Sequence, residues 1–536
     1  MAPVSYALGG RVVTMADGAT PIDHGVVYVT GNSIVDVRDA AADPPAGFEG
    51  VPVLQSGGTI YPGLIELHNH LSYNVLPLWQ VPQVYKNRDK WSVPPLYRKI
   101  ISGPMKIVGT TRGLPESVVR YAEAKCLLGG TTTSQGIALY SNAGIRKFYF
   151  GAVRNVEDAK DAALPNAATK IPDVAAKDAA KFLDRLKSAA KNGKTQILHL
   201  SEGTDDSAES HFQALHLANG EWAIEKSLAG IHCVSLTSAD YDVMASKGAS
   251  MVWSPLSNLL LYGKTANIKA ARAAGVRAGI GSDWSPSGSK NLLFEMRVAR
   301  LVGQTVGGIS DKELLAMATT NAAGILGWGK ALGSLEKGKR ADLIVINEQT
   351  HDPYAHLFLA GETDVALTVI DGVARAGSER LMTALAAGRP TERVTVGSTS
   401  RLLDLGQDGV DPLIANLSLA EATTRLRDAM NKLPELAKIS EGVAFVPPPL
   451  TLELDHDEIE GFSLRPELPD RVTGKLTGQL PIPPAGLASL AVPLSEVLEP
   501  IPLDPLTVAG DSDFLDVLSN EQNIPAGLRA AIGQLS

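Results

Sequence analysis

The segment LIELHNHLSYN places two histidines two residues apart, at the end of an apolar run typical of a buried strand. Because positions i and i+2 of a strand point to the same face, the imidazoles of His68 and His70 would project together, and such a pair can share one metal ion. Alone the pattern is weak, since a chain with 10 histidines contains a His-x-His by chance in roughly one case in five. Two strand-end histidines that merely hydrogen-bond to their neighbours are the alternative interpretation.

Three further apolar runs end in side chains of the same kind. QILHLSEG ends in His199, with Glu202 three residues later; LAGIHCVSL carries His232, and VRAGIGSDW ends in Asp283. Four strand ends thus present four histidines and one aspartate, which suits a metal held by three imidazoles and a carboxylate, with one group left for a substrate. We therefore predict a metal site; a degenerate site that binds nothing is the alternative.

The elements that must position these residues follow the pattern of a parallel sheet with helices outside it. Between residues 61 and 330, strand-like runs alternate with Ala-rich helical patterns. This length of about 270 residues is close to the roughly 250 of an eight-stranded βα barrel, whose active sites lie at the carboxyl ends of the strands. The predicted fold class is α/β, a (βα)8 TIM-type barrel. Only seven strands are convincing: 64–70, 131–137, 147–155, 195–202, 229–235, 250–255 and 276–283.

Both flanks of the predicted barrel are rich in short β-branched runs and turns, which indicate a small composite β-sandwich domain. The remaining extension is Pro-rich, and its segment 440–506 is expected to run extended over the surface or over a partner subunit. Two short helices are expected at its end. The predicted domains are 1–60 (N-terminal segment of the β-sandwich), 61–330 (barrel), 331–390 (C-terminal segment of the β-sandwich) and 391–536 (extension of open role).

Composition narrows the partners of the chain. Its 49 Lys and Arg against 58 Asp and Glu give a net charge of −9, which offers no general attraction to nucleic acid or anionic lipid. Only two cysteines are present, the first residues do not form a signal peptide, and no run of about 18 apolar residues could span a bilayer. We expect a cytoplasmic protein with a small-molecule substrate, no nucleic-acid or membrane partner, and a homo-oligomeric state as an open option.

Several motifs resemble those of the amidohydrolase superfamily, in the branch of cytosine deaminase-like and triazine hydrolase-like enzymes. They cover residues 4–390 in order and include YPGLIELHNH, HLSE, SPLSN, GSDW, LLFEMRVA and ATTNAAGILGWGKALGSLEKGKRADLIVIN. The resemblance implies that His68, His70, His199 and Asp283 bind a single divalent ion. Zinc is the expected ion, although His-rich sites also accept iron and manganese. The other six histidines have no partner at ligand spacing and are not expected to bind metal: His24, His211, His216, His351, His356 and His456.

The resemblance also implies roles for two further residues, and general chemistry agrees with them. A divalent ion lowers the pKa of bound water from 15.7 to about 7. Glu202 would receive the proton of that water and return it to the leaving amine. His232 would donate a hydrogen bond to the atom that gains negative charge, and Asp283 would also contact the attacking oxygen. A structural fourth ligand is the alternative for His232, and a solvated loop carboxylate is the alternative for Glu202.

The substrate is less well defined by the sequence. Asn74, Trp79, Asn258 and Trp284 lie near predicted strand ends and are predicted to line a pocket for a flat or cyclic molecule; core packing and turn formation are the alternatives. The predicted function is that of a metal-dependent hydrolase of a non-peptide C–N bond in an amide or amino-heterocycle. The alternatives are a dehalogenase or isomerase of the same superfamily and a non-catalytic binding member.

Overall fold

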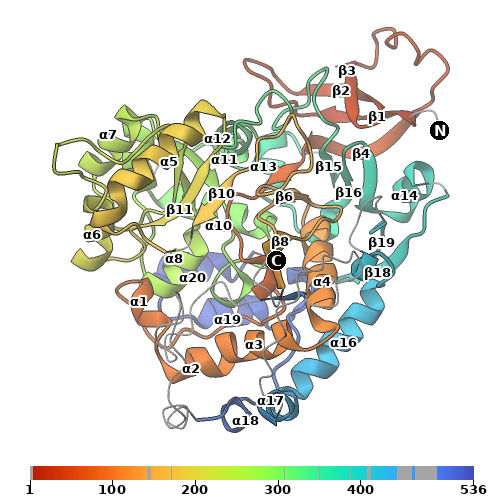
Figure 1. Cartoon of the computed structure of the whole chain (residues 1–536). Coiled ribbons are helices and arrows are strands. Elements are labelled where there is room, and N and C mark those ends of the chain that lie inside the picture. The colour runs from red at the N-terminus through yellow and green to blue at the C-terminus, as the bar shows by residue number, and fades with distance from the viewer. Residues whose placement is uncertain are drawn as a thin grey trace, which may run out of the picture.

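The structure is a computed structural model that describes most of the chain (Figure 1). The described residues are 4–141, 146–170, 172–306, 308–348, 350–386, 388–406, 412–442, 462–464 and 492–535. Most of segment 440–506, predicted to be extended, lies outside these ranges. No helix in the described ranges is long and apolar enough to cross a membrane.

Strands from both flanks form one nine-stranded sheet, in the order β18-β19-β17-β16-β15-β4-β1-β2-β3 (Figure 1, upper right). The flanks meet where β4 pairs antiparallel with β15, with Pro62 opposite Leu343. Leu8, Val27 and Leu367 are buried in one apolar cluster, and the intervening residues Val26 and Tyr28 are buried in a second cluster with Phe48. The strands are β1 (Ser5–Val12), β2 (Ile22–Thr30), β3 (Ser33–Asp39), β4 (Val53–Pro62), β15 (Leu343–Asn347), β16 (Val365–Ile370), β17 (Val373–Gly377), β18 (Glu392–Val396) and β19 (Thr399–Leu403).

Two parallel sheets lie between the flanks. The larger contains β10 (Ala168–Lys170), β11 (Gln196–Leu200), β12 (Leu228–His232), β13 (Ser250–Trp253) and β14 (Arg277–Ile280), and the smaller contains β5 (Leu64–Ile65), β6 (Thr131–Ser134) and β9 (Arg154–Asn155). Backbone hydrogen bonds link the two sheets at both edges. Leu67 N–H donates to Ile280 O at 3.2 Å, and Ala167 N–H donates to Val156 O at 2.8 Å.

Helices connect and cover these strands. The helix α5 illustrates the sequence pattern, because Phe182, Leu183 and Leu186 are buried at a spacing of three to four residues while its lysines face outward. Capping boxes fix the starts of α7 and α11, through Thr237 and Ser310. The helices of this region are α1 (Arg88–Trp91), α2 (Pro95–Tyr97), α3 (Gly103–Thr110), α4 (Leu114–Leu128), α5 (Ala179–Lys191), α6 (Asp206–Gln213), α7 (Ser238–Ser246), α8 (Pro255–Tyr262), α9 (Ile268–Ala274), α10 (Leu292–Val306), α11 (Asp311–Met317) and α12 (Thr320–Ile325).

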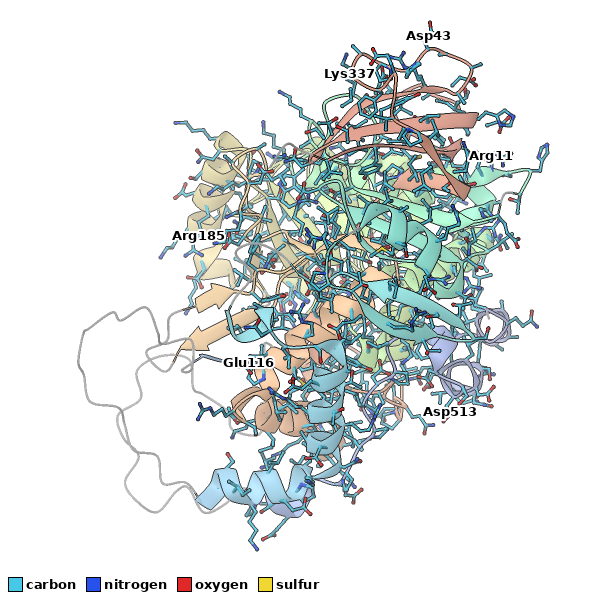
Figure 2. All side chains as sticks on the ribbon, turned by 90° about the vertical axis from the view of Figure 1, so that its right-hand side faces the viewer. Arg11, Asp43, Glu116, Arg185, Lys337 and Asp513 are labelled. Carbon is cyan, nitrogen blue, oxygen red and sulfur yellow. The ribbon has the colours of Figure 1, made fainter. Side chains whose placement is uncertain are left out.

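The C-terminal region of the chain returns to the body of the protein. In Figure 1 its helices α18 to α20 lie beside α1 to α3, at the end opposite to β1 to β3. Figure 2 shows the side chain of Asp513, from this segment, on the surface, as are the labelled charged residues Asp43 and Arg185. The remaining helices are α13 (Pro353–Leu357), α14 (Glu379–Leu385), α15 (Pro412–Ala415), α16 (Leu419–Asn431), α17 (Leu433–Gly442), α18 (Leu494–Val497), α19 (Phe514–Asn520) and α20 (Ala526–Ile532). The two predicted terminal helices are α19 and α20.

The predicted strand 147–155 is wrong as a single element. Its start belongs to β8 (Arg146–Phe148), which pairs antiparallel with β7 (Ala138–Ser141) in a separate sheet with β20 (Phe462–Leu464), and its end is β9. Within the two parallel sheets, the strand that the sequence did not reveal is β10. It is three residues long and has no apolar run, so periodicity could not identify it.

The ends of β5 and β14 approach so closely that only glycine fits at position 281. A Cβ on Gly281 would lie 2.5 Å from the backbone oxygen of His68 and 2.7 Å from its Cβ. We therefore expect Gly281→Ala to lower the free energy of unfolding by about 1–3 kcal/mol, the usual cost of overpacking a tight contact. Urea denaturation would measure this loss. Gly329→Ala is the matched control, because nothing lies within 4 Å of its added Cβ; equal losses in the two variants would contradict the prediction.

Candidate metal centre

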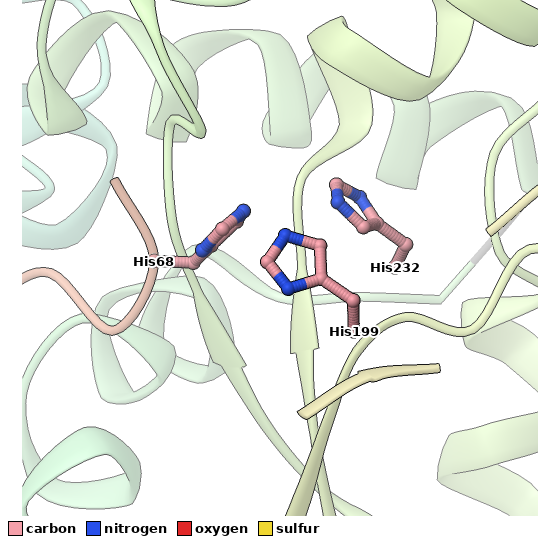
Figure 3. Close-up of side chains that lie close together, drawn as sticks. All are labelled: His68, His199 and His232. Atoms are coloured by element: carbon pink, nitrogen blue, oxygen red, sulfur yellow. The ribbon is translucent and has the colours of Figure 1, made fainter. Parts of the chain in front are cut away.

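Four histidines and one aspartate converge at the carboxyl ends of β5, β11, β12 and β14. The ligand atoms of His68, His199 and His232 all lie within 4.8 Å of one another, and so do those of His68, His70 and Asp283. Figure 3 shows the rings of His68, His199 and His232 grouped together. All five side chains are buried. The structure thus brings together every residue that the sequence suggested as a metal ligand.

Backbone contacts fix the relative positions of the ligands from the first and last strands. Asp283 N–H donates to His68 O at 3.1 Å, and His70 N–H donates to Asp283 O at 2.5 Å. Asp283 and His232 both have a φ of 66°, in the left-handed region that costs a non-glycine residue about 1–3 kcal/mol. The chain turns sharply at these two residues, immediately after β14 and at the end of β12.

Hydrogen bonds also fix which nitrogen of His68 is free to bind a cation. Its Nδ1 lies 3.0 Å from Gln135 Oε1, which can only accept, so Nδ1 carries the proton. The lone pair is therefore on Nε2, 2.9 Å from Asp283 Oδ1. The same Asp283 oxygen lies 3.6 Å from His70 Nε2, while the other accepts a hydrogen bond from Ser257 Oγ at 2.6 Å. Gln135 and Ser257 thus orient two of the candidate ligands.

Three buried polar atoms in the cluster have no hydrogen-bond partner among the described residues: His68 Nε2, His199 Nδ1 and Glu202 Oε2. Burial, together with neighbouring His68 and Arg88, lowers the pKa of His199 well below its ordinary value. The ring is therefore neutral near pH 7, with a lone pair free to bind. Buried polar atoms without a partner are costly, and a neutral imidazole is a preferred zinc ligand. The donor set present fits a divalent cation.

The charge on Asp283 also suits cation binding. Burial raises the pKa of Asp283, but the nearby imidazoles of His68, His232 and His70 oppose this effect, and the net pKa lies below the ordinary value. The carboxylate is therefore ionised at neutral pH. A charged carboxylate oxygen among imidazole nitrogens is a donor set that suits a divalent cation.

Glu202 faces this cluster from the loop after β11. Its Oε2 lies 3.8 Å from His232 Nε2 and 3.8 Å from the Arg88 guanidinium. Its Oε1 accepts a hydrogen bond from Tyr262 at 2.6 Å, and Trp91 Nε1 donates to the same hydroxyl at 2.8 Å. Burial raises the pKa of Glu202, while Arg88 opposes the shift. One oxygen of Glu202 is thus anchored, and the other faces the histidines.

His232 is held in one tautomer by Asn258. The amide Nδ2 of Asn258 donates to His232 Nδ1 at 2.9 Å, and its Oδ1 accepts from Thr265 at 3.2 Å. Burial is the main reason that the pKa of His232 is lowered to about 3, so the ring is neutral at physiological pH. Because Nδ1 accepts, the single ring proton lies on Nε2, the nitrogen that faces Glu202.

The four predicted substrate-binding residues differ in their surroundings. The ring of Trp284 is centred 6.2 Å from that of His70, whereas Trp79 packs against Tyr85 and Tyr97 at 6.2 and 6.3 Å. The other two are engaged with protein atoms. Asn74 bonds Asn69 Oδ1 and Ser285 N at 3.0 and 2.8 Å, and Asn258 orients His232.

Sequence reasoning missed four residues that contact the cluster: Arg88, Gln135, Ser257 and Tyr262. Gln135 directly follows β6 and Ser257 lies within SPLSN, so strand-end position and motif could have identified them. Arg88 and Tyr262 lie on helices that pack over the strand ends, and no pattern in the sequence places them there.

Residues 59–375 match the profile of the amidohydrolase family. The chain belongs to this family. It is 26% identical to the 5-methylthioadenosine/S-adenosylhomocysteine deaminase of Moorella thermoacetica over 393 residues, which is 64% of this chain and 90% of the relative. The protein of the same name from Desulfitobacterium hafniense is 30% identical over 357 residues, which is 60% of this chain and 82% of the relative. The chain is a hydrolase that acts on carbon–nitrogen bonds other than peptide bonds.

Solved structures agree on the fold. A zinc-containing adenosine deaminase from Xanthomonas campestris superposes with a TM-score of 0.55 at 19% identity, covering 79% of this chain and 98% of the other. A triazine hydrolase variant superposes with a TM-score of 0.53 at 20% identity, covering 69% and 94%. Guanine deaminase of E. coli gives 0.50 at 17% identity, covering 69% and 99%.

Because the ring of His199 lies among the candidate ligands, we expect His199→Ala to lose its bound divalent metal while keeping its fold. A hydrophobic core of this size does not need the ion for stability. Metal content per chain, measured by plasma mass spectrometry after dialysis, should fall at least tenfold, and circular dichroism should be unchanged. The control is His216→Ala, an exposed histidine. Full metal content in the His199 variant would contradict the assignment, and global unfolding would show a structural metal.

Proposed function

We propose that the chain is a metal-dependent deaminase of an amino-substituted heterocycle, which replaces a ring-bound amino group by oxygen and releases ammonia. The observation that carries the proposal is the arrangement of Glu202 and His232, 3.8 Å apart beside the candidate metal ligands. The names of its relatives, deaminases of 5-methylthioadenosine and S-adenosylhomocysteine, support an aminopurine as the first substrate class to test.

We further propose that the eight parallel strands close into one (βα)8 barrel. The two hydrogen bonds between the parallel sheets, at Leu67 and Ala167, support closure in the order β5-β6-β9-β10-β11-β12-β13-β14. In this proposal residues 61–330 form the barrel, and residues 1–60 and 331–390 form a composite β-sandwich domain beside it. Strands β18 and β19, which follow residue 390, continue the sheet of this domain, so the C-terminal extension begins after β19.

His68, His70, His199 and Asp283 would hold one divalent ion, for which we propose zinc. When bound, such an ion lowers the pKa of a coordinated water so that it can act as a nucleophile at neutral pH. His68 is prepared for this role by Gln135, which leaves Nε2 unprotonated, and Asp283 is prepared by the surrounding imidazoles, which keep it ionised.

Glu202 would transfer the proton between the two reacting groups. As the oxygen of water bonds to the amino-bearing carbon, Oε2 accepts its proton and then delivers it to the amine, so that the carbon–nitrogen bond breaks and ammonia leaves. Tyr262 anchors Oε1 and leaves Oε2 free for this transfer. Arg88 lies 3.8 Å from the same oxygen and favours the ionised form of Glu202, which is the form that can accept the proton of water.

His232 would stabilise the negative charge that develops on the ring nitrogen of the substrate. Its Nε2–H is a donor at neutral pH, because Asn258 occupies Nδ1 and the ring is not protonated. Trp284 and Trp79 would form the apolar walls for a flat ring, whereas Asn74 and Asn258 would support the site through the contacts described above.

The first test is ammonia release from a panel of aminopurines, aminopyrimidines and aminotriazines. Glu202→Gln should keep its metal but lose about 10²- to 10⁴-fold in kcat, because the amide cannot transfer the proton. Glu209→Gln, on α6 near the surface, is the control and should retain activity. Halide or carboxylate release without ammonia from matched substrates would contradict deamination, and full activity of the Glu202 variant would contradict its role.

A second test addresses the tautomer of His232. Asn258→Ala removes the donor to Nδ1, so the proton is no longer confined to Nε2, and we expect kcat to fall by about tenfold or more with little change in metal content. Steady-state kinetics and metal analysis of the same preparation would measure both. An unchanged kcat would show that Asn258 does not orient a catalytic group.

A further inference from the structure

The C-terminal extension places a buried carboxylate beneath the loops that carry the candidate metal ligands. Asp504 lies between α18 and α19 and is only 1% exposed, as are Lys125 of α4 and Lys290 before α10. Both lysines bond to Asp504, one to each carboxylate oxygen. Lys290 also contacts Asp511 at 2.8 Å. Asp504 lies outside the segment that matches the family, so this carboxylate is a feature of the extension.

Lys125 connects this carboxylate to the two loops. Besides Asp504, its ammonium donates to Asn74 O at 2.8 Å and to Ser285 Oγ at 3.2 Å. Asn74 follows His70 by four residues, and Ser285 follows Asp283 by two. All three protons of the ammonium are thus directed at fixed acceptors. The charge of Lys125 can stay buried in this position only because Asp504 compensates it.

A continuous chain of hydrogen bonds runs from these loops to the ligands. Ser285 N–H donates to Asn74 Oδ1 at 2.8 Å, and Asn74 Nδ2 donates to Asn69 Oδ1 at 3.0 Å. Asn69, between the first two histidines, donates to Ser282 Oγ at 2.9 Å. Ser282 immediately precedes Asp283. The ends of β5 and β14 are therefore linked through side chains as well as through the backbone.

The backbone of Asp504 is attached to the same region. Its N–H donates to Val75 O at 3.0 Å, and its carbonyl accepts from Tyr121 OH at 2.6 Å. Farther along the extension, Asn523 Nδ2 donates to Leu260 O at 2.8 Å on α8. Every polar group of Asp504 is thus engaged, and the segment 492–535 is held against the loops at several points.

We propose that Asp504 is a positioning residue of the metal centre: by compensating Lys125 and Lys290 it fixes the loops after β5 and β14, and thereby the spacing of His68, His70 and Asp283. The inference rests on the proposed metal site. Partners of this kind typically change metal affinity by about 10- to 100-fold when they are removed. The extension is then a component of the active centre without touching the substrate.

The test is titration of the metal-free full-length protein with cobalt(II), followed by its visible absorption. Asp504→Asn removes the carboxylate that compensates the buried ammonium groups of Lys125 and Lys290. We expect the cobalt dissociation constant to rise by tenfold or more and the visible spectrum of the bound cobalt to change. Asp516→Asn, an exposed carboxylate of the same segment, is the matched control and should bind cobalt like the parent. Thermal unfolding of each metal-free variant is measured in parallel.

Lys125→Met is the second variant, because it removes the link to the loops while leaving Asp504 paired with Lys290. It should also weaken cobalt binding tenfold or more, and it decides the question if the Asp504 variant does not fold. Folded variants that bind cobalt with the affinity and spectrum of the parent would overturn the proposal. Lower thermal stability alone, or loss of fold in both variants, would also overturn it by showing a purely structural role. A parent protein that binds no cobalt would instead contradict the proposed metal site.

Discussion

The site buries imidazole and carboxylate atoms, and a buried polar atom without a hydrogen-bond partner is energetically unfavourable. His68 Nε2, His199 Nδ1 and Glu202 Oε2 are buried without hydrogen-bond partners among the described residues, beside candidate ligand atoms that lie within 4.8 Å of one another in two groups of three. Burying polar atoms without partners is costly. A divalent ion held by the candidate ligands would offset part of this cost. The strained turns at His232 and Asp283 are a further cost that a binding site can offset.

The candidate ligands were predictable because each lies at the end of a strand that the sequence reveals through an apolar run. The His-x-His pair, His199 and Asp283 all follow such runs, and parallel strands bring their carboxyl ends together. By contrast, β10 has no apolar signal, and the two ends of the predicted strand 147–155 belong to different sheets. Apolar patterns in a sequence do not distinguish a strand of a parallel sheet from a short hairpin beside it.

Residues that act through other residues were not predictable in the same way. Gln135 and Asn258 set the tautomers of His68 and His232, yet amide side chains at strand ends and in helices are common and carry no periodic signal. Two of the residues predicted to contact substrate, Asn74 and Asn258, bond to protein groups. Asp504 is separated from its partner Lys125 by 379 residues, and no local pattern could connect them.

The central claim is that one divalent cation is bound by imidazoles and a carboxylate from separate strands. Metal-edge X-ray absorption of the zinc-loaded full-length protein, combined with metal analysis, tests it most directly. We predict one zinc ion per chain in a shell dominated by imidazole nitrogen, and loss of this signal in His199→Ala. Substoichiometric metal, or an unchanged shell in that variant, would contradict it.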